Sequence, residues 1–500
     1  MGDVLHNGRM PKHPAYLLSI DLDKRSVRVI GNNPPPNHPA FSTDVSPRFD
    51  LTVYRVLADA VEIETHWLSS TPIFFRRNGA RVFAANSLAD LAQVSHLQTD
   101  TQRLSALIHQ KRTDGPGDPQ FADITVAHPG DTIRITFADG GVHISALQDE
   151  RTAACTPLPE SQIEDALVAS LERRIAGASK LAFAISGGVD STTLAALGSR
   201  LFSGQPILCF TARTHGGSDL PFAIQAARDI GADLRIVDVP VDASALALHS
   251  AAVSAACHPI AFSGNSIGFA AICRAARAEG VDVIVDGTGS DPLFGGGYML
   301  HGIYWARAEG LDRSSQQFAE FIEAAKAMGH FSQEDIAKLT AEPTERIDYG
   351  LKMRREMTRG GMARWRSHHI ANARAHDIRI AMPYLDDDVA RFVWHEPTAY
   401  FQKGWNKAPL RRVLERYVSS EVAWRRSEQG LRWPVRPFLS KNRFAMSQYI
   451  AGSRIRSVSL GYWAAGALGV LPAARLGRLY STAHAHDSAL EAYTQGQYRG

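Results

Sequence analysis

Two glycine-rich segments carry residue types that bind phosphate. The first, Ser186-Gly187-Gly188-Val189-Asp190-Ser191, lies between an apolar run at 181–185 and a helical pattern at 192–201. Glycines let the backbone approach a ligand closely, and the start of the helix presents free N–H groups and a positive dipole end. The hydroxyls of Ser186 and Ser191 add donors, and Asp190 can hold Mg²⁺ against phosphates. These features predict a pyrophosphate cradle that is not a Walker A loop; an ordinary glycine-rich turn is the alternative.

The second segment, residues 286–297, has the sequence Asp-Gly-Thr-Gly-Ser-Asp-Pro-Leu-Phe-Gly-Gly-Gly and follows an apolar run at 281–285. Ligands of open α/β sheets bind beyond the carboxyl ends of the strands, where the strand order reverses. If the strand order is 3-2-1-4, the two loops face each other. Asp190 and Asp291 would then approach Mg²⁺ from two sides, with Gly287 and Gly289 in the nucleotide site. The alternative role of Asp291 is that of a helix N-cap.

The elements that must position these loops begin near residue 160. From there the hydrophobic pattern alternates between helices and short apolar strands, which predicts a doubly wound parallel sheet in an α/β domain. The predicted strands are 181–185, 207–211, 234–239 and 281–285, and the predicted helices are 163–175, 192–201, 222–230 and 267–278. Thr211 ends the second strand on the ligand-binding edge and joins the predicted nucleotide-binding residues. Beyond about residue 302 the chain is predicted to be mainly helical.

Residues 1–150 have a strand-rich pattern instead. Three hairpins are predicted, at 15–30, 72–85 and 131–147. The turns Asn78-Gly79 and Asp139-Gly140 are strong hairpin signals because they favour positive φ. This part is predicted to be a mostly antiparallel β domain, and the polar segment 151–159 is the predicted linker.

Composition limits the class of protein. With 500 residues, 45% hydrophobic and 21% charged, the chain fits a globular enzyme of two or three domains. A net charge of +3 does not favour nucleic acid or membrane as a partner. The four cysteines form no CxxC pair, which disfavours zinc and fits a cytoplasmic protein. The uncharged stretch 457–474 is rich in Gly and Ala, and we expect a pair of packed helices there.

The two loops resemble those of asparagine synthetases and related ATP pyrophosphatases. Residues 186–191 have the family's SGGVDS pattern, and 287–296 have its GxGxDxxFGG pattern. Two further segments are similar to the family more loosely. Residues 381–386 resemble its V-P-F-L-D segment, and residues 407–411 resemble its K-x-x-L-R segment, in which the lysine lies near the ATP phosphates. The resemblance implies binding of ATP and Mg²⁺, catalytic roles for Lys407, Asp190 and Asp291, and metal binding by the two carboxylates.

The first domain resembles the family's glutaminase domain in residues 71–91 and in His128-Pro-Gly130. Glutamine-using members carry a catalytic cysteine directly after Met1. This sequence has Gly2 there, and no cysteine precedes Cys155. The resemblance therefore predicts a vestigial glutaminase-like domain at 1–150 that does not hydrolyse glutamine, and an asparagine synthetase-like domain at 160–500. The amine is then expected to come from the substrate itself.

Two branches of the family fit that expectation. Both adenylate a carboxylate, release pyrophosphate and close a ring with an amine of the same substrate. The short first domain resembles the lasso-peptide cyclases more closely, and their partners would be a peptide substrate, a leader peptidase and a leader-binding protein. A β-lactam or carbapenam synthetase acting on a small-molecule carboxylate is the alternative. A catalytically inactive binding protein is another, because Glu428 stands where the family has a lysine.

No motif identifies the base that accepts the amine proton. His258, Tyr298 and His301 are candidates by location alone, and each is more commonly a structural residue. Two further classes remain as rivals. A tRNA-thiolating or NAD-forming ATP pyrophosphatase is disfavoured by the lack of reactive cysteines or a basic surface, and a glutamine-dependent amidotransferase is disfavoured by Gly2.

Overall fold

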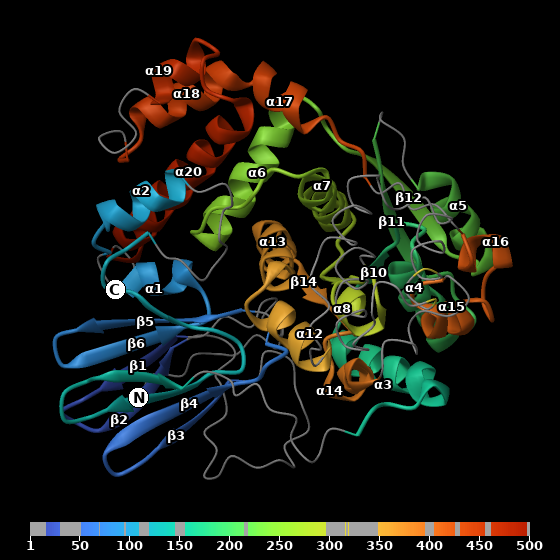
Figure 1. Ribbon diagram of the computed structural model, residues 1–500, viewed down its shortest axis with the longest axis horizontal. Coiled ribbons are helices and arrows are strands. Elements are labelled where there is room, and N and C mark those ends of the chain that lie inside the picture. Colours follow the sequence, from blue (N-terminus) through green and yellow to red (C-terminus); the bar gives the residue numbers. More distant parts are fainter. Residues whose placement is uncertain are drawn as a thin grey trace.

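The chain forms two antiparallel sheets, one parallel sheet and a helical C-terminal part (Figure 1). The computed structural model describes residues 17–30, 52–69, 71–94, 97–109, 120–145, 156–214, 219–296, 349–395, 405–425, 431–455 and 462–497, with Gln316 and Ala319. Fold class is therefore as the sequence predicts, with antiparallel sheets first and a parallel α/β sheet after them.

The two antiparallel sheets pack face to face. One has the order β2(Ser26–Ile30), β1(Leu17–Asp21), β6(Arg81–Ala85), β5(Ile73–Asn78), β7(Thr125–Ala127), and the other β3(Thr52–Val56), β4(Ala60–Thr65), β8(Thr132–Thr136), β9(Val142–Ser145). Alternate residues of each sheet, such as Ile20, Ile63 and Ile133, point into a shared core because side chains alternate along a strand. The three predicted hairpins are confirmed as β1–β2, β5–β6 and β8–β9.

The parallel sheet has the order β12(Asp233–Asp238), β11(Leu208–Arg213), β10(Leu181–Ala184), β13(Val283–Val285), β14(Arg379–Ala381). Its first four strands confirm the predicted order 3-2-1-4. The fifth strand, β14, was not predicted; the chain beyond residue 302 was expected to be mainly helical, and three residues are too few to show a strand pattern. The order reverses between β10 and β13, which is where a ligand crevice forms in such sheets.

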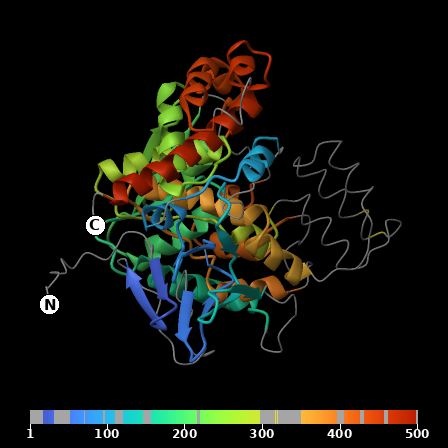
Figure 2. The same ribbon diagram turned by 90° about the vertical axis from the view of Figure 1, so that its left-hand side faces the viewer.

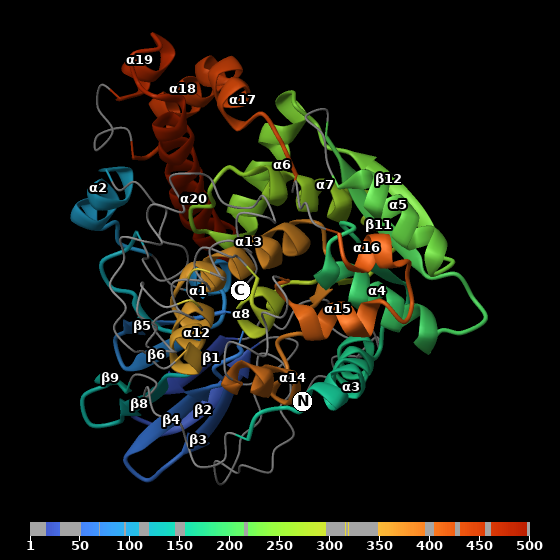
Figure 3. The ribbon, with the colours of Figure 1, turned by 45° about the vertical axis from the view of Figure 1, so that its right-hand side comes forward.

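Helices cover the parallel sheet (Figure 3). Helices α4(Val189–Leu201) and α5(Leu220–Asp229) pack on β10 and β11, α3(Ile163–Ile175) packs on α4, and α7(Gly264–Ala278) and α13(Gly361–Ala375) contact each other as well as the sheet. Helix α6(Ala243–Ala256) was not predicted; it packs against α7 and α13. The remaining described α-helices are α1(Leu88–Val94), α2(Thr101–His109), α8(Ser290–Phe294), α12(Tyr349–Thr358), α14(Asp387–Ala390), α15(Ala408–Leu414), α16(Ser420–Ala423), α17(Val435–Lys441), α18(Arg443–Gly452), α19(Tyr462–Ala467) and α20(Ala473–Gln497).

The β domain and the α/β domain are in direct contact. Helix α20 packs along α1 and α6, as Figure 2 shows from the side. Arg374 of α13 donates to Asp90 of α1 at 2.9 Å, and the indole of Trp67 donates to Asp387 at 3.2 Å. In the described part of the predicted 457–474 pair, α19 and the start of α20 are helical. None of the described helices combines the length and apolar character that crossing a bilayer requires.

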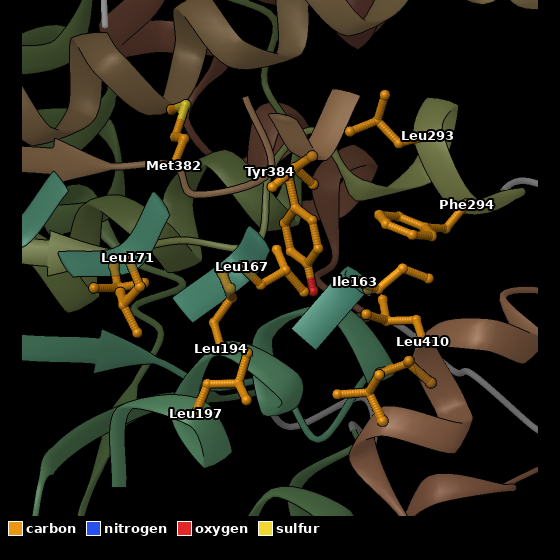
Figure 4. Close-up of a cluster of buried hydrophobic side chains, with 14 of the residues drawn as sticks. Ile163, Leu167, Leu171, Leu194, Leu197, Leu293, Phe294, Met382, Tyr384 and Leu410 are labelled. Atoms are coloured by element: carbon orange, nitrogen blue, oxygen red, sulfur yellow. The ribbon is translucent and has the colours of Figure 1, made fainter. Parts of the chain in front are cut away.

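A single apolar cluster holds the elements that carry both glycine-rich loops. Tyr384 lies at its centre, surrounded by Ile163, Leu167, Leu194, Leu293, Phe294 and Leu410 from α3, α4, α8 and α15 (Figure 4). Phe183 of β10 belongs to the same cluster and is 1% exposed. Its ring packs so closely on α4 that a Cβ at Gly198 would lie 2.3 Å from it.

Replacing Phe183 with alanine is therefore expected to destabilise the α/β domain by about 3–5 kcal/mol, because it removes a fully buried ring and leaves a cavity. Thermal unfolding followed by circular dichroism measures this as a fall in Tm. Phe444 provides the matched control, since it is 70% exposed, and Phe444→Ala should change the stability by less than about 0.5 kcal/mol. Equal shifts for the two variants would contradict the packing described here.

Candidate nucleotide-binding site

A cavity of about 330 Å³ opens at the carboxyl ends of β10, β11 and β13. Both glycine-rich loops form its wall. The predicted nucleotide-binding residues that line it are Ser186, Gly188, Asp190, Ser191, Thr211, Gly287 and Gly289, and Asp291 lines it too. The strand order therefore brings the two loops together at one cavity, as the sequence predicted. Its volume lies within the range of small-molecule sites.

Gly187 is the predicted residue that does not line the cavity. Its φ is +74°, and a Cβ there would lie 2.5 Å from the backbone nitrogen of Ala223. Only glycine fits this backbone conformation beside α5 without strain. Gly187 therefore lets the loop turn against α5.

The first loop, residues 186–191, is stabilised by hydrogen bonds between its own residues and by one from Tyr384. The hydroxyls of Ser186 and Ser191 lie 3.0 Å apart, and the backbone nitrogen of Ser186 donates to Ser191 Oγ at 3.0 Å. Helix α4 begins at Val189, earlier than predicted, so Asp190 and Ser191 are in its first turn. Tyr384, from the 381–386 segment, donates to the carbonyl oxygen of Asp190 at 2.9 Å. The aromatic core thus fixes the position of the loop.

The second loop approaches the first almost backbone to backbone. A Cβ at Gly287 would lie 3.1 Å from the nitrogen of Ser191 and 3.3 Å from Asp190 Cβ. Helix α8 follows, and its N-cap is Gly289, with φ +104° and no side-chain capping bond. Asp291 lies in the first turn of α8, so its alternative role as the N-cap is excluded.

Lys407 joins the two loops electrostatically. Its Nζ lies 2.6 Å from a carboxylate oxygen of Asp190 and 2.5 Å from one of Asp291, and its side chain is 3% exposed. A Cβ at Gly296 would lie 2.7 Å from Lys407 Cε and 1.7 Å from Asp291 Oδ1, so this close approach needs glycine. The three predicted catalytic residues therefore form one ion-paired cluster.

The backbone of Lys407 is in the left-handed region, with φ +51°. Such a conformation is costly for a residue with a Cβ and is found mainly at functional positions that their surroundings enforce. Arg411 helps to hold the backbone around Lys407 in this conformation. Its buried guanidinium donates to the carbonyl of Asn406 at 2.9 Å and to the carbonyl of Ala423 at 2.8 Å.

The donor set of the cluster fits Mg²⁺. Asp190 and Asp291 have side chains 26% and 46% exposed, and both line the cavity. Mg²⁺ is usually held by one or two carboxylates together with substrate phosphates. These two aspartates would hold it here. Among the described residues, no group of three or more His, Cys, Asp or Glu side chains has the geometry of an all-protein metal site.

Several cavity residues were not identified from the sequence. Arg425 pairs with Asp219 at 3.0 Å and lies over the ring of Phe222, which places a buried cation beside the first loop. His369 and Asp286 meet in the wall at 3.2 Å. Asp286 opens the second glycine-rich segment, but His369 lies 83 residues further along and belongs to no recognisable motif, so no signal in the sequence joined them.

Of the candidate bases, only His258 belongs to the described residues, and it does not line the cavity. His258 lies in the wall of a different, smaller pocket near Phe74 and Arg374. Burial lowers the pKa of His258 to about 4, and its Nδ1 lies 3.2 Å from the carbonyl of Pro259. His258 is therefore a structural histidine. Tyr298, His301 and Glu428 lie outside the described residues.

Removing the hydroxyl of Tyr384 tests the support of the first loop. Tyr384→Phe leaves the carbonyl of Asp190 without this donor, and one such hydrogen bond is worth about 0.5–1.5 kcal/mol. We expect KM for ATP to rise roughly three- to tenfold. Tyr449→Phe is the control, because Tyr449 also hydrogen-bonds to another residue, Asp487, but packs against a different apolar cluster from the one that contains Tyr384. An unchanged KM in Tyr384→Phe would contradict the proposed support.

A family model described as asparagine synthase matches residues 162–484, which is more than half of the chain. The match includes both glycine-rich loops and Lys407. No curated protein matches the sequence.

Proposed function

The chain belongs to the asparagine synthase family of ATP-dependent amide ligases, and we propose that it adenylates a peptide carboxylate and joins it to an amine of the same peptide. The product would be a macrolactam, as in the lasso-peptide cyclases that the sequence resembles. The observation that carries the proposal is the cluster of Lys407, Asp190 and Asp291 between two glycine-rich loops at one cavity.

The geometry suits transfer of an adenylyl group. The substrate carboxylate attacks the α-phosphorus of ATP, and the bond to the leaving pyrophosphate breaks. The N–H groups at the start of α4 and the hydroxyls of Ser186 and Ser191 would bind that pyrophosphate, which is supported by the place of both serines in the cavity wall. Bound Mg²⁺ would neutralise the charge that grows on it. Lys407, whose side chain is 3% exposed, contributes a fixed positive charge, and such charges act most strongly where water is excluded.

The amine is proposed to come from the substrate. Residues 1–150 contain no cysteine, so this domain has no thiol for glutamine hydrolysis. The cysteines among the described residues, Cys209, Cys257 and Cys273, are all buried. Burial raises the pKa of Cys209 and of Cys257 to about 12. These thiols are unsuited to thiolation chemistry, which argues against a tRNA-thiolating function.

The test uses linear candidate peptides that carry a free N-terminal amine and an Asp or Glu side chain. We expect incubation with the protein and Mg-ATP to give a peptide lighter by one water, together with AMP and pyrophosphate. AMP with an unchanged peptide would retain adenylation but exclude cyclisation of this substrate, and small-molecule amino acids would be tested next, as for a β-lactam-type synthetase. Lack of nucleotide turnover with every acid would exclude the ligase and favour a binding protein.

A further inference from the structure

The wall of the nucleotide cavity contains the imidazole of His369, on α13. Its ring stacks on Phe269 with the centroids 4.4 Å apart, and its centroid lies 5.5 Å from that of Trp365. Both aromatic residues also line the cavity. The side chain of His369 is 11% exposed. The ring is therefore held in one orientation in the wall of the cavity.

Asp286 determines which nitrogen of His369 carries the proton. His369 Nδ1 lies 3.2 Å from Asp286 Oδ2, while Asp286 Oδ1 accepts from the backbone nitrogen of Thr288 at 2.8 Å. Burial alone would raise the pKa of Asp286, but the charge of His369 and the hydrogen bonds from His369 and Thr288 hold it below its usual range. An ionised carboxylate only accepts, so Nδ1 donates to Asp286 and Nε2 is the ring nitrogen left to accept a proton from a substrate.

Nε2 of His369 is the unused acceptor of this pair. It is buried and has no hydrogen-bond partner among the residues that the structure describes. Buried polar atoms are nearly always hydrogen-bonded, so such an atom in a cavity wall points to a missing ligand. A histidine in the cavity wall with one nitrogen fixed by a carboxylate and the other without a hydrogen-bond partner has the arrangement of a general base.

We propose that His369 is the general base of amide formation and that Asp286 is its positioning residue. The inference rests on the proposed function and deepens it by naming the proton acceptor. The amine nitrogen attacks the acyl carbon of the adenylate and forms the C–N bond. Its proton passes to His369 Nε2, and the bond from the acyl carbon to the AMP oxygen breaks. AMP leaves with that electron pair, and the imidazolium is stabilised by Asp286.

His369→Asn is the test variant, because the asparagine amide can still donate to Asp286 from near the position of Nδ1, while Nε2 is lost. The matched control is His368→Asn. His368 is the neighbouring residue on α13, is also buried, and does not line the cavity. Burial lowers the pKa of His368 to about 3, so its imidazole is uncharged at neutral pH.

Three rates separate the steps, all measured with a linear peptide of the kind described above. The first is ATP–pyrophosphate exchange, which reports adenylation alone. The second is hydroxamate formation with added hydroxylamine, a strong nucleophile that is largely unprotonated at neutral pH and needs no base. The third is macrolactam formation. In His369→Asn we expect the first two to remain near wild type and the third to fall by roughly 10²–10⁴-fold.

The outcomes distinguish the two proposals. A selective loss of the macrolactam, with His368→Asn unaffected, supports His369 as the base. Equal losses of all three rates would assign His369 to binding or folding and overturn the inference, while leaving the ligase function intact. Unchanged macrolactam formation would also overturn it. A wild-type protein without pyrophosphate exchange would overturn both proposals.

Discussion

Asp190→Asn is expected to slow adenylate formation by roughly a thousandfold or more, a loss of about 4 kcal/mol of transition-state stabilisation. Asparagine has nearly the shape of aspartate, so the loop and α4 should be retained. What is lost is one of the two carboxylates that line the cavity and share Lys407. ATP–pyrophosphate exchange at several Mg²⁺ concentrations measures the effect. The slower rate should appear together with weaker binding of Mg²⁺.

Asp238→Asn is the matched control. Asp238 is also an ion-paired carboxylate at the end of a parallel strand, 2.6 Å from Arg213, but it lies on the edge strand β12 and does not line the cavity. Its exchange rate should stay within about twofold of wild type, since surface pairs contribute little. If Asp190→Asn kept more than a tenth of the activity at an unchanged Tm, Asp190 would not be a metal-binding residue.

Much of this site follows from short-range sequence features. The pyrophosphate loop could be predicted because glycines, a buried strand and a helix follow one another within about twenty residues. The strand order 3-2-1-4 then places 286–297 opposite 186–191 without any further information, and the structure has that order. The hairpins of the first domain could be predicted as well, because a two-residue turn such as Asn78-Gly79 is a purely local signal.

Features that depend on long-range packing were not predictable. Strand β14 has three residues and is defined by pairing with β13, nearly a hundred positions earlier. Asp286 and His369 come together only because α13 packs against α7 beside the end of β13. Neither His369 nor Arg425 differs in its local sequence from an ordinary surface residue. Composition and periodicity cannot show a contact that the tertiary fold alone creates.

Lys407→Met is the second substitution with a large expected effect. Methionine has nearly the length of lysine and also carries a Cβ, so the left-handed backbone at φ +51° is about as strained in the variant as in wild type. The ammonium that contacts Asp190 and Asp291 is lost. We expect pyrophosphate exchange to fall by roughly 10²–10³-fold, as for other fixed charges that stabilise a transition state.

Lys180→Met is the control, because it also removes a hydrogen-bonded ammonium group but does so away from the cavity. Lys180 donates to the carbonyl of Glu279 at 2.7 Å, in an exposed position at the start of β10. Its removal should leave the exchange rate unchanged. Comparable losses in both variants would show that overall charge matters and that the position of Lys407 does not.

Magnesium dependence decides what Lys407 does. If the ammonium only neutralises Asp190 and Asp291, added Mg²⁺ can replace it, and excess metal should restore the rate of Lys407→Met. If the ammonium acts on the phosphates, the variant should remain slow at saturating Mg²⁺, with the loss in kcat rather than in KM. We expect the second result. The left-handed backbone and the buried guanidinium of Arg411 hold Lys407 in a costly position, and two partly exposed carboxylates could be neutralised without that cost.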